Sequence, residues 1–175
     1  SLPLTPVASR KEARRLALDA MELGAGSVIC QWSPRFVEAA AECGVPVRGH
    51  IGLVPRRSTG TGGFRPVGKT VEQALDLAQQ LKDLENAGAW AVECEVIPTR
   101  VLQALSQRTS LVTVSLGSGP SDVQFLFAQD ILGDGRPPFP RHSRQYCNLK
   151  AVRDQMQDMR KLAFETFSVD VREGR

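Results

Sequence analysis

TVEQALDLAQQLKDLENAGAWAVECEVI, residues 70–97, decides the fold of this 175-residue chain. Apolar side chains recur at helical spacing between Thr70 and Asn86, and Gly88 then provides a helix stop. A run rich in apolar residues follows over 89–97, which is typical of a strand. The stretch therefore predicts one unit made of a helix, a glycine and a strand.

The same unit occurs elsewhere along the chain. Further helices are expected over 10–23, 33–43, 98–107 and 149–168, and further strands over 27–31, 46–53, 111–116 and, more weakly, 123–128. Strands that alternate with helices favour parallel pairing, because parallel neighbours need a crossover connection. Nearly continuous apolar strands fit a sheet that is covered by helices. The predicted fold class is α/β.

Composition excludes several classes of function. The 22 basic and 19 acidic residues are scattered and give a net charge of only +3, which does not favour a nucleic-acid partner. No apolar run of about 18 residues and no signal-like start are found, so we expect no membrane association and a cytoplasmic protein. The 4 cysteines include no Cys-x-x-Cys pair and the chain has 2 histidines, which does not predict a zinc site or a disulfide framework.

Residues 54–69 interrupt the helix–strand alternation with a glycine-rich segment that directly follows a strand. Loops after strands lie at the active-site face of parallel barrels, so this segment is interpreted either as a lid over a ligand or as a plain surface excursion.

Three motifs resemble those of a known family. Gly49-His50-Ile51-Gly52-Leu53-Val54-Pro55, followed by Glu95-Val96-Ile97-Pro98 and Gly117-Ser118-Gly119, resembles the signature of the ketopantoate hydroxymethyltransferase (3-methyl-2-oxobutanoate hydroxymethyltransferase) family. The resemblance spans essentially the whole chain. It implies a (βα)8 TIM barrel, of which this chain covers the end of strand 3 to strand 8 and a C-terminal helix, as a single partial-barrel domain over 1–175. The first barrel strands are then expected upstream or on another chain.

The resemblance also implies a reaction. Family members transfer a hydroxymethyl group from methylenetetrahydrofolate to a 2-oxo acid in pantothenate biosynthesis, with magnesium chelated by the oxo acid, and they form homo-oligomers. The chemistry needs an enolate, which a divalent ion stabilises while a carboxylate removes the proton. By resemblance, Glu95 is the catalytic base, and His50 orients the substrate oxygen.

The magnesium motifs depart from the family pattern. Ser1 stands where an aspartate is expected, Gln31 replaces a glutamate, and Ile29 replaces the lysine that contacts the substrate carboxylate. A hydroxyl and an amide are poor substitutes for the carboxylates that magnesium prefers. We therefore expect no metal ligand to be retained in this chain, which makes magnesium doubtful, and we expect Gln31 to contact the substrate instead.

Side-chain parity places further charges on the same face. Residues two apart share one face of a strand, so Arg48 lies beside His50, and Glu93 beside Glu95. We expect Arg48 to pair with Glu93 or Glu95, either as a new binding site for a substrate carboxylate or as a structural ion pair. The alternatives for function are a hydroxymethyltransferase, a catalytically degenerate relative that binds a small oxo acid, and an enzyme that acts on a different oxo acid.

Overall fold

A computed structural model describes residues 2–4 and 6–175. It contains a six-stranded sheet in which every neighbouring pair is parallel and the strands follow one another in chain order. The strands are β1 (Leu2–Pro3), β2 (Val28–Ile29), β3 (Val47–Gly52), β4 (Ala91–Glu95), β5 (Val112–Leu116) and β6 (Val123–Gln124). The predicted α/β class and parallel pairing are confirmed.

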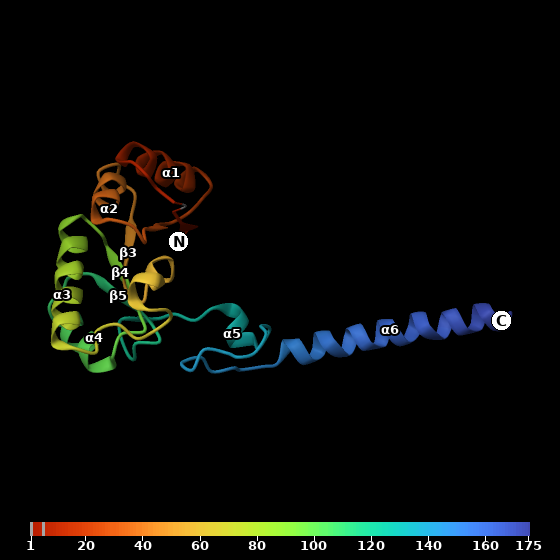
Figure 1. Ribbon diagram of the computed structural model, residues 1–175. Coiled ribbons are helices and arrows are strands. Elements are labelled where there is room, and N and C mark those ends of the chain that lie inside the picture. The colour runs from red at the N-terminus through yellow and green to blue at the C-terminus, as the bar shows by residue number, and fades with distance from the viewer. Residues whose placement is uncertain (1, 5) are drawn as a thin grey trace. The chain divides into compact units, whose positions relative to one another are not determined.

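The order of the strands identifies the type of α/β fold. Crossovers between parallel strands are right-handed, so strands added one after another in chain order place their helices on one face, as in a barrel. The helices are α1 (Arg10–Glu22), α2 (Pro34–Ala41), α3 (Val71–Asn86), α4 (Thr99–Ser106), α5 (Ala128–Leu132) and α6 (Leu149–Glu173). Figure 1 shows α2, α3 and α4 on the same side of strands β3–β5. The sheet is therefore part of a barrel wall, and it is open within the described residues.

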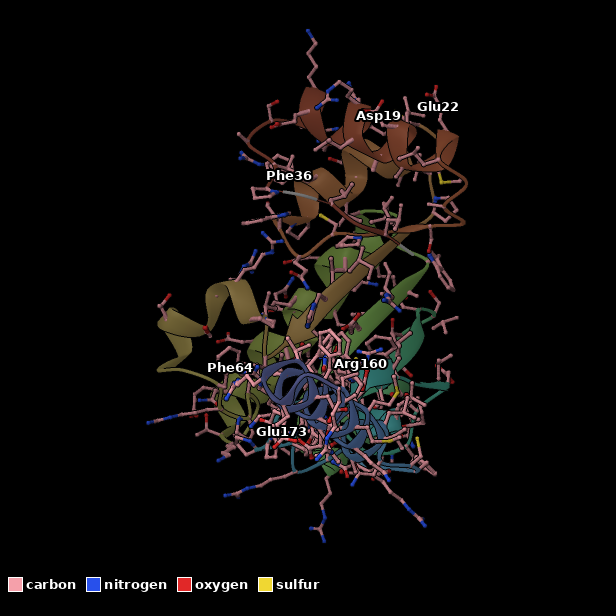
Figure 2. The ribbon with its side chains drawn as sticks, turned by 90° about the vertical axis from the view of Figure 1, so that its right-hand side faces the viewer. Asp19, Glu22, Phe36, Phe64, Arg160 and Glu173 are labelled. Carbon is pink, nitrogen blue, oxygen red and sulfur yellow. The ribbon has the colours of Figure 1, made fainter. Side chains whose placement is uncertain are left out.

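Local chemistry explains where the helices begin. The side chain of Ser9 accepts a hydrogen bond from the backbone N–H of Glu12 at 3.2 Å, and Thr70 caps α3 in the same way through Gln73 at 3.3 Å. The outer face of α1 is charged, as Asp19 shows in Figure 2. The apolar sides of α1–α4 pack on the strands in one core, so tertiary burial holds these helices in place.

Several elements differ from the sequence expectations. β1 and α5 were not predicted from the pattern, α6 runs five residues beyond the predicted end at 168, and β6 is limited to Val123–Gln124. The glycine-rich segment is not irregular throughout, because Pro55–Thr61 forms a 3-10 helix. Two-residue strands are too short to carry a period, so the pattern misses β1, whereas the family resemblance puts the end of a barrel strand at this place.

The chain divides into two compact units, residues 1–125 and 126–175. The second unit holds α5 and α6, and its connecting segment is tied to α5 by the backbone N–H of Tyr146, which donates to the carbonyl of Ile131 at 2.8 Å. Helix α6 has no buried residue. In the described part of the chain, no helix combines the length and the apolarity that crossing a membrane requires. The single-domain expectation stays a prediction.

Candidate functional site

The two faces of the central strands have different chemistry. Val92 and Cys94 of β4 belong to the core under the helices, whereas Ala91 is buried but lies outside that core. On β3, a Cβ added to Gly49 would lie 2.6 Å from Cδ1 of Leu84 on α3, so Gly49 faces the helices as well. The alternate residues of both strands therefore face away from the helices, toward the inside of the barrel wall.

Four charged or ionisable side chains meet on this inner face. Nη2 of Arg48 lies 3.0 Å from Oε2 of Glu93, and Nε2 of His50 lies 3.1 Å from Oε2 of Glu95. Arg48 was expected to pair with Glu93 or Glu95, and it pairs with Glu93; the predicted parity is confirmed. The side chains of Arg48 and Glu93 are only 12% and 7% exposed, so their attraction is weakly screened by solvent. We call Gln31, Arg48, His50, Glu93 and Glu95 the polar cluster.

Gln31 joins the cluster from the end of β2. Its Nε2 lies 3.1 Å from Nδ1 of His50, and an amide that donates to Nδ1 leaves the proton of a neutral imidazole on Nε2. The opposite amide orientation would let Oε1 accept from Nδ1–H and would leave a lone pair on Nε2. Gln31 therefore controls which form of His50 faces Glu95.

The backbone next to Glu95 is fixed by its neighbours on β3. The carbonyl of Glu95 accepts a hydrogen bond from the N–H of Leu53 at 2.8 Å. Gly52 has a φ of 87°, and a Cβ at this position would come within 2.3 Å of the same carbonyl. Only glycine fits this close approach, which gives the second glycine of the Gly-His-Ile-Gly motif a physical reason.

The residue after Glu95 has an unusual backbone. Val96 has a φ of 50°, the one positive value for a non-glycine residue within the described residues. Its N–H donates to the carbonyl of Leu116 at 2.8 Å, and its carbonyl accepts from the N–H of Val67 at 3.2 Å. Such conformations persist where surrounding contacts enforce them, and they concentrate at functional sites.

Ser118 locks the same turn from β5. Its Oγ donates to the carbonyl of Cys94 at 2.8 Å and accepts from the N–H of Ile97 at 2.8 Å. Sequence reasoning did not assign a role to Ser118, although the Gly117-Ser118-Gly119 motif was the signal that marked it. The two glycines allow the chain to turn so that the serine reaches β4.

Two arginines contact aromatic rings, and one of them, Arg48, belongs to the cluster. The guanidinium carbon of Arg48 is 5.8 Å from the centre of the Phe125 ring, and that of Arg56 in the 3-10 helix is 5.4 Å from the Trp32 ring. Nε of Arg48 is buried and makes no hydrogen bond to any described residue. One donor of this guanidinium therefore has no hydrogen-bond partner among the described residues.

Other titratable groups near the sheet are structural. Asp122 accepts hydrogen bonds from the backbone N–H and the hydroxyl of Thr113, both at 2.8 Å, and these bonds lower the pKa of its carboxyl. Burial raises the pKa of the Cys94 thiol to about 12 and also raises the pKa of Cys30. Both cysteines are free thiols that stay protonated at neutral pH.

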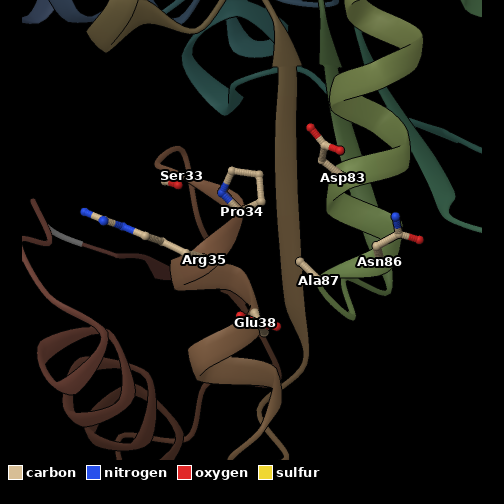
Figure 3. Close-up of a pocket in the computed structure, with 7 residues that line it drawn as sticks. All are labelled: Ser33, Pro34, Arg35, Glu38, Asp83, Asn86 and Ala87. Atoms are coloured by element: carbon tan, nitrogen blue, oxygen red, sulfur yellow. The ribbon is translucent and has the colours of Figure 1, made fainter.

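A surface pocket of about 330 Å³ lies elsewhere, between the start of α2 and the end of α3. Figure 3 shows Asp83 and Asn86 on α3 across from Pro34 and Glu38, with the side chain of Arg35 extending away from α3. No residue of the polar cluster lines this pocket. This pocket and the polar cluster are therefore separate sites.

The residues predicted for the site lie close together, and their functional roles stay predictions. Glu95, His50, Arg48 and Gln31 were predicted as site residues, and the fold brings all of them together with Glu93. Ser1 lies outside the described residues. The expectation that no metal ligand is retained rested on positions 1 and 31, where the family has metal-binding acids. The fold brings together another set, His50, Glu93 and Glu95, whose ligand atoms lie within 4.8 Å of one another.

Comparisons with known proteins agree with the motifs. A model of the family described as ketopantoate hydroxymethyltransferase matches residues 1–175. The 3-methyl-2-oxobutanoate hydroxymethyltransferases of Pyrobaculum arsenaticum and Nitrosopumilus maritimus are 36% and 33% identical over 88% and 89% of this chain. This chain spans 61% and 58% of their lengths. A solved deoxyribose phosphate aldolase from Aeropyrum pernix is 15% identical, with a TM-score of 0.46 over 66% of this chain and 49% of its own. The chain belongs to the ketopantoate hydroxymethyltransferase family.

Proposed function

We propose that the protein transfers a hydroxymethyl group from methylenetetrahydrofolate to a small 2-oxo acid, as a step of pantothenate biosynthesis. The observation that carries this proposal is the meeting of His50 and Glu95, which come from two separate family motifs and lie 3.1 Å apart on the inner face of the sheet. A base and a group that orients the substrate oxygen are the minimum that enolate formation needs.

Each residue of the cluster has a role in this reaction. The carboxylate of Glu95 takes the proton from the carbon next to the 2-oxo group, and the electron pair left on that carbon forms the new C–C bond to the methylene carbon of methylenetetrahydrofolate. Both C–N bonds of that carbon break, water supplies the hydroxyl oxygen, and tetrahydrofolate leaves with its two nitrogens protonated. His50 donates a hydrogen bond to the 2-oxo oxygen, where negative charge develops. Arg48, whose buried Nε has no hydrogen-bond partner among the described residues, and the part of the Gln31 amide that is not bound to His50 bind the carboxylate of the oxo acid.

Magnesium does not fit the position where the family holds it. The resemblance calls for a carboxylate at position 31, but the residue is a glutamine whose amide is engaged with His50. Magnesium prefers charged oxygen ligands in octahedral geometry, which this side chain does not supply. No step of the proposed reaction therefore depends on magnesium at Gln31.

A catalytically degenerate relative is the second candidate. Glu93 already neutralises Arg48 through a contact of 3.0 Å, which weakens its attraction for a substrate carboxylate. Together with Gln31 in place of an acid, this pairing supports a protein that binds a small oxo acid without converting it. An enzyme for a different oxo acid would use the same Arg48 and Gln31 contacts.

Product formation from 3-methyl-2-oxobutanoate and methylenetetrahydrofolate tests the proposal. Glu95→Gln should lower kcat by about 10²–10⁴ while KM changes little, because a base acts in the transition state. Glu85→Gln is the matched control, since Glu85 is bound to Ser110 away from the cluster. Turnover that survives in Glu95→Gln would overturn the assignment of the base. Absence of turnover in the unaltered protein, together with calorimetric binding of the oxo acid, would establish the degenerate relative.

Association between copies of the chain belongs to the same proposal. Helix α6 exposes apolar side chains along its length, among them Met159, Phe164 and Phe167. Apolar patches of this kind are typical of surfaces that pair with another protein. We propose a cytoplasmic homo-oligomer, and light scattering of the purified protein would show its mass.

A further inference from the structure

His50, Glu93 and Glu95 present three groups that ligate metal ions. One imidazole nitrogen and two carboxylate oxygens all lie within 4.8 Å of one another, on two adjacent strands. Ligand atoms around one ion are roughly 3–4 Å apart when each bond is about 2.1 Å long. Small changes of side-chain torsion therefore suffice to place all three atoms around one ion.

The charge of the cluster favours a cation. Two carboxylates, Glu93 and Glu95, share the inner face with one guanidinium, that of Arg48, which is bound to Glu93. The side chain of Glu95 is 14% exposed and faces His50. A buried carboxylate that lacks a cation is costly, and a metal ion or a proton removes this cost.

His50 provides a second, independent observation. Its side chain is 1% exposed, and its Nε2 makes no hydrogen bond to any described residue although it lies 3.1 Å from a carboxylate oxygen. When Oε1 of Gln31 accepts from Nδ1–H, the lone pair of Nε2 points into the cluster. A hydrogen-bond partner at the other ring nitrogen is the usual support for a histidine that binds metal.

We propose that His50, Glu93 and Glu95 form a binding site for one divalent transition-metal ion of the zinc or manganese type. One imidazole and two carboxylates suit these ions better than magnesium, which prefers oxygen ligands alone. Three protein ligands also leave a position open for water or a small acid. The site shares no residue with the positions 1 and 31 where the family pattern places metal-binding acids.

A metal ion at this site should affect catalysis, and this effect rests on the proposed function. A metal ion bound to Glu95 removes the lone pair that accepts the substrate proton. Zinc therefore inhibits turnover with the same concentration dependence as its binding, and a chelator restores activity.

Calorimetric titration with zinc chloride tests the site directly. The protein carries Cys43→Ser and Cys147→Ser, because these exposed thiols would bind zinc by themselves. We expect one ion per chain, and His50→Gln and Glu93→Gln should each weaken binding by about 10–100-fold or more. The matched control is His142→Ala, which removes an exposed histidine in the second unit and should leave the affinity unchanged.

Arg48→Met separates metal binding from misfolding. Removal of the guanidinium frees Glu93 and removes a repelling charge, so zinc should bind about tenfold more tightly or better. A variant that merely misfolds cannot gain affinity. Cobalt(II) should give visible absorption bands that His50→Gln alters, which shows directly that the imidazole is a ligand.

Three results would overturn the inference: no saturable zinc binding, unchanged affinity in both His50→Gln and Glu93→Gln, or no tightening in Arg48→Met. Zinc binding is measured without turnover, so the two proposals fail separately. A protein that binds zinc at His50 but forms no product keeps this site and loses the proposed reaction. A protein that forms product without binding zinc keeps the reaction and loses this site.

Discussion

Replacement of Arg48 by methionine tests the energetics of the buried ion pair. The Glu93 side chain, which is 7% exposed in the intact protein, loses its partner at 3.0 Å. Removing one member of a buried pair costs about 3–5 kcal/mol, and we take about 3 kcal/mol because Arg48 itself keeps 12% exposure. The lost contact with the Phe125 ring adds about 0.5 kcal/mol. The ratio of folded to unfolded protein should fall by more than about 100-fold.

Urea unfolding followed by circular dichroism measures this change in the free energy of unfolding. The midpoint should shift while the slope with urea stays constant, because the surface exposed on unfolding is the same. Arg15→Met is the matched control. It breaks the exposed pair with Asp19, whose side chains are 62% and 50% exposed, and should cost less than about 0.5 kcal/mol.

The double variant Arg48→Met/Glu93→Leu completes the test. Replacing both partners by apolar residues removes the unpaired charge, so most of the lost stability should return. Two results would contradict this coupling. Arg48→Met would lower the free energy of unfolding by no more than Arg15→Met does, or the double variant would lose as much free energy of unfolding as the two single variants added together.

Three further predictions concern the backbone and the thiol around the site. Ser118→Ala should lower the free energy of unfolding in urea by about 1–3 kcal/mol, because the serine hydroxyl joins two buried backbone groups. Gly52→Ala should lower the free energy of unfolding, measured in the same way, by about 2 kcal/mol or more. Gly24→Ala should lower it by only about 1 kcal/mol, because Gly24 has a similar φ of 86° but a Cβ there would have no atom within 4 Å. The pKa of Cys94 is raised from 9.0 to about 12, so the native state holds this proton more tightly than the unfolded state. Its contribution to stability is complete below about pH 9 and is lost as the pH rises toward 12; urea midpoints across that range should show a decline that is absent from Cys94→Ala.

The sequence predicts helices best where the apolar period extends over several turns. Helices α1 and α3 span several turns with side-chain caps, so their starts at Arg10 and Val71 follow from period and capping. The pairing of Arg48 with Glu93 was also predictable, because side chains alternate along any strand, and a buried charge needs a partner.

Features that depend on tertiary contacts were not predictable. β1 pairs with β2 through two residue pairs, and so short a strand has no period of its own. The role of Ser118 appears only when β5 lies beside β4. The contact between Gln31 and His50 also depends on the register of neighbouring strands, since no local rule joins residues on different strands.

The turn at Val96 has a consequence for how this protein can change. A β-branched residue with a φ of 50° costs roughly 1–3 kcal/mol, and neighbouring strands enforce that conformation one residue after Glu95. Glycine at this position would relieve the strain and would also loosen the direction of the Glu95 carboxylate. A laboratory selection for heat resistance alone should therefore accumulate substitutions at Val96, while a selection that also demands product should reject them.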